Sequence, residues 1–107
     1  MRNFALSINK NSNRTIGVVG GGQLALMLAE AAKKRDIDLI VQTCSRTDPA
    51  VSQASGLVLS DTNDINGTKK LIEKCKCVTF ENEWIDLEAF YSLEKQGASF
   101  VPSLEAI

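Results

Sequence analysis

The sequence predicts a single α/β domain built on a doubly wound, Rossmann-like parallel sheet of about five strands, with helices on both faces. Two observations lead to this fold class. Short β-branched runs alternate with helix-like amphipathic runs between residues 15 and 102, which is the pattern of repeated βαβ units. The first β-branched run ends in consecutive glycines and leads directly into a helical pattern, as in the first turn of many nucleotide-binding sheets.

The first half of the domain contains two predicted strands and one predicted helix. Residues 16–19 form a short, mostly β-branched run that is typical of a buried parallel strand. From Gln23 the apolar residues recur at helical spacing, and the basic residues at 33–35 favour the end of a helix. The run IDLIVQ at 37–42 predicts the second strand.

The polar segment after the second strand predicts a short helix. Asp48 is a suitable N-cap, and Pro49 suits the first helical position because proline lacks an amide proton that this position leaves unpaired. We therefore expect a short helix that starts at Pro49 and ends at Ala54.

The second half of the domain repeats the alternation of strands and helices. The predicted elements are a strand at 57–60, a helix at 63–75, a strand at 76–80, a helix at 87–96 and a strand at 98–101. Asp86 can cap the last of these helices, Gly97 can end it in a left-handed conformation, and Pro102 ends the final strand.

The two ends of the chain fall outside this alternation. Residues 1–14 are polar and lack periodicity, so we expect a flexible tail before a domain at 15–102. Ser103 is a suitable helix cap, yet the residues at 104–107 allow only about one helical turn. We expect this turn to begin a helix that leads into a further domain outside the sequence.

Composition and charge exclude several classes of protein. The chain has 107 residues, of which 44% are hydrophobic, and a formal net charge of -1, so it offers no basic surface for nucleic acid. No apolar run approaches the roughly 20 residues that a membrane helix needs, and the polar N-terminus does not match a secretory signal. We expect a cytoplasmic protein with neither a nucleic-acid nor a membrane partner.

The cysteines do not predict a disulfide framework or a metal site. Cys44, Cys75 and Cys77 make an odd number, and the last two would point to opposite faces of a strand. The sequence has no histidine to complete a zinc site. We expect reduced cysteines that act as small hydrophobic residues, and no metal.

The triple glycine at 20–22 is the first candidate binding feature. It lies between the first strand and the first helix, at the edge where parallel sheets bind ligands. A helix start presents unpaired N–H groups, and residues without side chains let an anion such as a phosphate reach them. A tight turn without a ligand needs fewer than three glycines, so the pattern favours a binding loop.

This loop also matches the dinucleotide fingerprint G-x-G-x-x-[GA] through Gly20, Gly22 and Ala25. Proteins that bind NAD usually carry an acid at the end of the second strand, where it holds the ribose hydroxyls. The residues at 42–43 here are glutamine and threonine, which counts against a nicotinamide cofactor. Arg46 could meet a 2′-phosphate, so an NADP-binding module stays open.

The second candidate feature is VTFENEW, at the carboxyl end of the fourth strand. This strand should lie next to the first one, so its loop should face the glycines across the switch point of the sheet. Glu81 and Glu83 can accept hydrogen bonds from a hydroxyl or an amine there. Either acid alone would suit a solvated loop, but their place at the crevice favours a polar-ligand site.

Three stretches, IGVVGGGQLALMLAEAAKKRDIDLIV, VTFENEWID and VPSLEAI, resemble the N-terminal domain of 5-(carboxyamino)imidazole ribonucleotide synthetases. These enzymes are also named the ATPase subunit of phosphoribosylaminoimidazole carboxylase. The resemblance covers 15–107, and GGGQL is typical of this family and of the related formate-dependent glycinamide ribonucleotide transformylase. Because the family belongs to the ATP-grasp superfamily, the resemblance implies a pre-ATP-grasp domain.

The resemblance implies a ligase of purine biosynthesis that carboxylates 5-aminoimidazole ribonucleotide with ATP and bicarbonate. Carboxyphosphate, or carbon dioxide released from it, would react with the exocyclic amine. ATP and Mg²⁺ would bind mainly to later domains of the complete enzyme, so the resemblance implies no catalytic residue, metal or cofactor in this fragment, and no activity of the fragment alone. An apolar surface left by the missing ATP-grasp domain would favour self-association, a homodimer included.

The resemblance assigns ribonucleotide contact to groups on two loops: Gly21, Gly22, Gln23, Leu24, Glu81 and Glu83. Glu83 is the first choice for the carboxylate, and Glu81 is the alternative. Many relatives continue GGGQLGRM, whereas this chain has Ala25 and Leu26, so a charge contact of the arginine does not transfer. Relatives that read LDP after the second strand differ from the QTC of this chain, and no role transfers there either.

Two other functions compete with a ligase domain. A doubly wound domain of this size could be an NADP-dependent or regulatory nucleotide-binding module. It could also be a non-catalytic domain that binds phosphorylated ligands.

Overall fold

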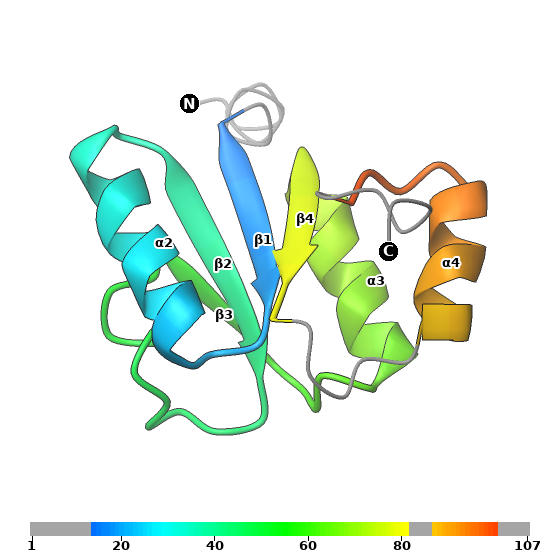
Figure 1. The fold of residues 1–107 in the computed structure, drawn as a ribbon, viewed down its shortest axis with the longest axis horizontal. Coiled ribbons are helices and arrows are strands. Elements are labelled where there is room, and N and C mark those ends of the chain that lie inside the picture. The colour runs from blue at the N-terminus through cyan, green and yellow to red at the C-terminus, as the bar shows by residue number, and fades with distance from the viewer. Residues whose placement is uncertain (1–13, 82–86, 101–107) are drawn as a thin grey trace, which may run out of the picture.

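The computed structural model describes residues 14–81 and 87–100. Within them the chain forms a four-stranded, all-parallel sheet of order β3-β2-β1-β4 with three helices (Figure 1). The strands are β1 (Thr15–Val19), β2 (Asp38–Thr43), β3 (Gly56–Leu59) and β4 (Cys77–Phe80). The predicted α/β fold class is therefore confirmed.

The strand order places the switch point between β1 and β4. In β1, Gly17 pairs with Ile40 of β2 on one side and with Val78 of β4 on the other. The chain moves outward from β1 to β2 and β3, then returns to the other side of β1 as β4. The loops that follow β1 and β4 therefore leave the sheet side by side at its carboxyl edge.

Helices cover both faces of the sheet (Figure 1). Helix α2 (Gln23–Lys34) packs the small residues Ala25, Ala29 and Ala32 against one face, together with buried residues of β1 and β2. Helices α3 (Ile65–Lys74) and α4 (Leu87–Lys95) cover the other face. The sheet thus separates two hydrophobic cores, as a doubly wound fold requires.

The second core is the more aromatic of the two. The rings of Phe90 in α4 and Phe100 stack with their centroids 5.5 Å apart, and both rings meet Phe80 of β4 edge to face. Leu71 of α3 is fully buried beneath them. A Cβ atom on Gly17 would lie 2.9 Å from Leu71 Cγ, so the missing side chain lets β1 and α3 approach closely.

Helix α2 ends in a Schellman motif that uses an aspartate where glycine is usual. Ile37 donates its amide to Ala32 O at 2.9 Å, and Asp36 donates to Lys33 O at 3.3 Å. Asp36 accordingly has a φ of 58°, and it is the residue other than glycine with positive φ in the described ranges. Gly97 after α4 has a φ of 110°, which confirms its predicted left-handed conformation.

Helix α3 starts with a side-chain cap. Asp64 accepts hydrogen bonds from the Asn66 amide at 3.0 Å and from the Ser60 hydroxyl at 2.8 Å. The Ser60 hydrogen bond is the largest cause that holds the pKa of the Asp64 carboxyl below its usual value, and backbone N–H groups add to it. The polar start signal in the sequence thus corresponds to a real cap one residue before the helix.

Two predicted elements differ from the structure. The predicted fifth strand at 98–101 is reduced, within the described residues, to an isolated bridge between Phe100 and Val78. The predicted helix from Pro49 to Ala54 is wrong, since this segment forms hydrogen-bonded turns. Within it, Ala50 donates its amide to Gly21 O at 3.1 Å, which ties the segment to the glycine loop.

Several predictions concern residues outside the described ranges. These are residues 1–13 of the tail predicted at 1–14, the Asp86 cap, and the segment at 101–107 with its expected helix start. The last residue of that predicted tail, Arg14, is described, and its carbonyl accepts the Asp38 amide at 3.0 Å. In the described part of the chain, no helix has the length and apolar character needed to cross a membrane.

Candidate functional site

The fold brings the glycine loop and the loop after β4 together, as the sequence predicts. Glu81 follows β4 directly and donates its amide to Val19 O at 3.0 Å, at the end of β1. Gly20 donates its amide to Gln42 O at 2.9 Å, so the glycine loop begins firmly attached to the end of β2. The candidate site therefore lies at the carboxyl ends of three adjacent strands.

Glu81 provides the N-terminal cap of α2. The N-cap residue is Gly22, which has no side chain and makes no side-chain cap. Glu81 Oε1 accepts instead a 2.8 Å hydrogen bond from the Ala25 amide, in the first turn of the helix. The carboxylate also meets the positive end of the helix dipole, where a negative charge is favourable. A residue far along the chain thus supplies the cap that the local sequence lacks.

Two of the three glycines make room for this acid. A Cβ atom on Gly22 would lie 2.9 Å from Glu81 Oε2, and one on Gly20 would lie 3.1 Å from Glu81 Cβ. Gly20 also has a φ of 120°, a conformation that residues with a side chain rarely adopt. The packing of Glu81 and the backbone conformation therefore favour glycine at position 20, and the carboxylate of Glu81 lies in the space that a side chain at position 22 would take.

A second carboxylate lies against the middle glycine. A Cβ atom on Gly21 would lie 2.8 Å from Asp48 Oδ2. Thr43, the last residue of β2, donates its hydroxyl to the same oxygen at 2.5 Å. The sequence analysis predicted Asp48 as a helix cap and did not include it among the site residues. Its position in the loop after β2 could have indicated this role, because β2 ends at the same edge of the sheet as β1.

The loop between the two acids offers both donors and acceptors. The amides of Gly22, Gln23 and Leu24 donate to no atom of the described residues. Within the same ranges, Asp48 Oδ1 and Glu81 Oε2 accept no hydrogen bond. Gln23 and Leu24 are exposed, and Gly22 is half-buried. This combination suits a group that both donates and accepts hydrogen bonds, such as a hydroxyl.

Gln42, at the position where a dinucleotide-binding protein carries its ribose-binding acid, has a structural role. It is fully buried, and its Nε2 donates to Asp61 O at 2.9 Å. Its Oε1 accepts the Thr68 hydroxyl at 3.0 Å. Both ends of the amide are therefore used inside the protein, which leaves no group here for the ribose of a nicotinamide cofactor.

The structure brings together most of the predicted site residues. Gly21, Gly22, Gln23, Leu24 and Glu81 share one edge of the sheet. Glu83 lies outside the described residues. Among the residues that the structure describes, no group of three or more cysteine, aspartate or glutamate side chains is arranged to hold a metal ion.

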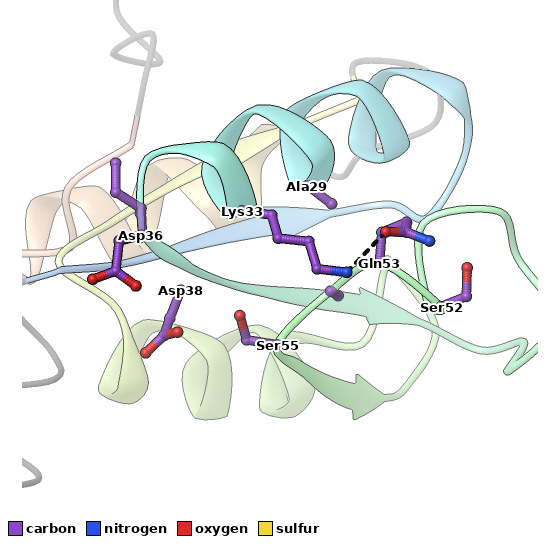
Figure 2. A pocket seen from close by; sticks show the side chains of 9 residues that line it. Ala29, Lys33, Asp36, Asp38, Ser52, Gln53 and Ser55 are labelled. Atoms are coloured by element: carbon purple, nitrogen blue, oxygen red, sulfur yellow. Dashed lines mark hydrogen bonds between the residues drawn. The ribbon is translucent and has the colours of Figure 1, made fainter.

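A separate pocket of about 180 Å³ lies at the opposite edge of the sheet. Figure 2 shows it beside the C-terminal half of α2, with Lys33, Asp36 and Asp38 among its lining residues. Lys33 Nζ donates to Gln53 Oε1 at 3.2 Å. The pocket contains none of the predicted site residues, so the glycine edge remains the candidate site.

Comparison with known proteins identifies the family of this chain. Residues 13–107 match the family described as the ribonucleotide synthetase preATP-grasp domain. The chain belongs to this family. The match covers most of the chain and includes both the glycine loop and the loop after β4, so the predicted resemblance to a pre-ATP-grasp domain is confirmed.

Individual relatives carry the names of ribonucleotide synthases. N5-carboxyaminoimidazole ribonucleotide synthase of Synechocystis sp. is 46% identical over 93 residues, which are 87% of this chain and 24% of that protein. The crystal structure of the synthetase from Thermotoga maritima superposes with a TM-score of 0.81 at 28% identity, covering 87% of this chain and 26% of that one.

A third relative was crystallised with two ligands. The N5-carboxyaminoimidazole synthase of Aspergillus clavatus, in complex with ADP and 5-aminoimidazole ribonucleotide, superposes with a TM-score of 0.76 at 31% identity. The match covers 90% of this chain and 26% of that structure. The chain thus spans about a quarter of the length of the relatives that it matches.

Proposed function

We propose that this chain is the ribonucleotide-binding domain of a purine-biosynthesis ligase that carboxylates 5-aminoimidazole ribonucleotide using ATP and bicarbonate. The observation that carries the proposal is the glycine loop held between Glu81 and Asp48, in a chain of the preATP-grasp family. Support also comes from the named relatives, one of which was crystallised with this ribonucleotide.

The chemistry of the loop favours the hydroxyl or amine groups of the ribonucleotide over its phosphate. Two carboxylates repel a phosphate dianion, although the amides at the start of α2, which have no acceptor among the described residues, would attract one. A ribose hydroxyl can donate to Glu81 Oε2 or Asp48 Oδ1 and accept from the amide of Gly22 or Gln23. The exocyclic amine can donate in the same way. The phosphate then points away from the glycine loop.

The remaining parts of the reaction belong to the rest of the enzyme. ATP would activate bicarbonate, and ATP and Mg²⁺ would bind mainly outside this chain. This domain would hold and orient the ribonucleotide, so these residues alone would not turn over substrate. Glu83 remains the other candidate for the ligand-binding carboxylate, and the docked ATP-grasp domain is the partner that the proposal requires.

Calorimetric titration of the chain with 5-aminoimidazole ribonucleotide and with NADP tests the proposal. We expect the ribonucleotide to bind and NADP not to bind. Glu81→Gln removes one charge-assisted acceptor, worth on the order of 1.5–3 kcal/mol, so it should weaken ribonucleotide binding about tenfold or more. Glu83→Gln in the same series shows which acid dominates.

The matched control is Glu88→Gln, on the exposed side of α4. It should leave the affinity unchanged. Binding of NADP in place of the ribonucleotide would return the chain to the class of dinucleotide-binding modules. If neither Glu81→Gln nor Glu83→Gln changes the affinity for the ribonucleotide, the proposed crevice is not the binding site.

A further inference from the structure

The sequence has no carboxylate at the end of β2, but the fold brings one back to that place. Gln42 and Thr43 end the strand, and the Gln42 amide is used in hydrogen bonds inside the protein. Asp48 comes five residues after Thr43, and its Oδ2 accepts the Thr43 hydroxyl. In dinucleotide-binding sheets, an acid at the end of the second strand holds the ribose 2′-hydroxyl. Asp48 therefore lies where a ribose-binding acid is expected.

The loop that carries Asp48 holds this residue in a defined position. The Asp48 amide donates to Ser45 O at 3.2 Å, and the Asp48 carbonyl accepts the Val51 amide at 3.1 Å. Ala50 is fully buried in the core on the α2 face and donates its amide to Gly21 O at 3.1 Å. The backbone on both sides of Asp48 is thus fixed, while its Oδ1 accepts no hydrogen bond from the described residues.

The glycine loop lies directly against this carboxylate. A Cβ atom on Gly21 would lie 2.8 Å from Asp48 Oδ2 and 2.9 Å from Asp48 Cβ, so the missing side chain allows this close approach. The amides of the next two residues, Gly22 and Gln23, have no acceptor in the described part of the chain. A hydroxyl suits this place because it can donate to Oδ1 and accept from an amide.

The other side of the loop disfavours the pyrophosphate of a dinucleotide. In dinucleotide-binding sheets, the pyrophosphate lies at the N-terminus of the helix that follows the first strand. Here Glu81 Oε1 accepts the Ala25 amide at 2.8 Å in the first turn of α2. A phosphate at the same place would meet the negative charge of Glu81. The loop therefore favours the neutral ribose of a ligand over its phosphate groups.

We propose that Asp48 is the specificity-determining residue of this site, because it accepts a hydrogen bond from the ribose 2′-hydroxyl and so selects ribonucleotides over 2′-deoxyribonucleotides. Thr43 is a positioning residue, which holds Oδ2 and leaves Oδ1 for the ligand. The inference rests on the proposed function, since the ribonucleotide must bind at the glycine loop to meet Asp48. A deoxyribose there leaves a charged acceptor without a donor, which is the physical basis of the selection.

Calorimetric titration with 5-aminoimidazole ribonucleotide and with its 2′-deoxy analogue measures the selection. We expect the unmodified chain to bind the ribonucleotide at least about tenfold more tightly than the analogue. Asp48→Asn should weaken ribonucleotide binding and reduce this ratio to roughly threefold or less, since the charge of the acceptor is lost. Asp38→Asn is the matched control, because Asp38 is an exposed aspartate at the opposite end of the same strand. It should leave both affinities unchanged.

Two variants of Thr43 test the positioning role. Thr43→Val removes the hydroxyl that holds Asp48, whereas Thr43→Ser keeps it. We expect valine to lower the ratio of the two affinities severalfold and serine to preserve it. If Thr43 only stabilises the fold, valine lowers the melting temperature and leaves the ratio unchanged. Circular dichroism checks the fold of every variant, and the Thr43 pair decides the question should Asp48→Asn fail to fold.

The outcomes separate this inference from the proposed function. If neither nucleotide binds, both are wrong. If the unmodified chain binds the two nucleotides equally, or if Asp48→Asn retains the full ratio, the ribonucleotide site stands and the role of Asp48 is wrong. A ratio that falls in Glu81→Gln and not in Asp48→Asn would assign the 2′-hydroxyl to Glu81 and overturn the inference.

Discussion

Glu81 combines two roles in a single side chain, and these roles use different oxygens. Oε1 accepts the Ala25 amide and caps α2, whereas Oε2 faces the glycine loop without a partner in the described ranges. The cap needs only an acceptor at Oε1, because a neutral amide oxygen can accept the same hydrogen bond. The proposed ligand contact needs the negative charge. Substitutions of this residue can therefore separate stability from binding.

We expect Glu81→Leu to lower the free energy of unfolding by about 1 kcal/mol, the usual value of an N-cap. Glu81→Gln should keep most of that stability, since its amide oxygen can still accept from Ala25. Urea denaturation followed by circular dichroism measures both variants. Equal losses for leucine and glutamine would show that the helix depends on the charge of Glu81 and not on its hydrogen bond.

At the scale of elements, a buried amide joins β2 to α3 and to the loop before it. Gln42 is surrounded by apolar residues of the sheet, yet it bonds the backbone of Asp61 and the hydroxyl of Thr68. Gly67 lies beside this amide, and a Cβ atom there would be 2.1 Å from Ser60 Oγ. The network holds the end of β3 and the start of α3 in place, which supports the edge of the sheet beside the candidate site.

We expect Gln42→Leu to destabilise the protein by about 1–3 kcal/mol, because the buried Thr68 hydroxyl loses one of its two acceptors and the Asp61 carbonyl loses the Gln42 donor. Hydrogen exchange should show the largest loss of protection at 60–68 rather than across the whole sheet. The double variant Gln42→Leu/Thr68→Val removes both polar partners, and it should recover part of the loss. A uniform loss of protection would mean that the network stabilises the whole sheet and not this connection.

At the scale of the whole molecule, burial in the fold determines which cysteines can react. Cys44 is exposed, whereas Cys75 is partly buried and packs against the core that contains the three phenylalanine rings. Burial, with a smaller effect of Cys77, raises the pKa of the Cys75 thiol from 9.0 to about 12. The thiolate is the reactive form, so the folded protein keeps Cys75 inert through the mildly alkaline range.

Alkylation with iodoacetamide at about pH 8.5, read by mass spectrometry, should modify Cys44 first and Cys75 at least roughly tenfold more slowly. The unfolded chain releases the Cys75 proton near pH 9 and the folded chain near pH 12, so the contribution of this thiol to stability falls as pH rises between these values. Labelling in urea should remove the difference in rates. Rapid labelling of Cys75 in the folded protein would contradict its position in the core.

Local patterns predicted much of the fold because they depend on neighbouring residues. The structure contains the strand predicted from the β-branched run before the glycines and the helix predicted from the spacing after Gln23. It also contains the left-handed turn predicted at Gly97. The order of these elements also predicted that the loops after β1 and β4 meet, since right-handed βαβ connections leave few other arrangements. The carboxyl edge and its glycine loop could therefore be named as a candidate site from the sequence.

Tertiary structure decided the features that depend on residues far apart in the chain. The Glu81 cap joins residues separated by 56 positions, and no local pattern links an acid after β4 to a helix after β1. The segment at 49–54 forms turns where a helix was predicted, and there the Asp48 carboxylate, expected to cap that helix, accepts from Thr43 of β2. Local cap signals compete with such contacts, and the contacts prevail when they satisfy buried polar groups that a short helix would leave unpaired.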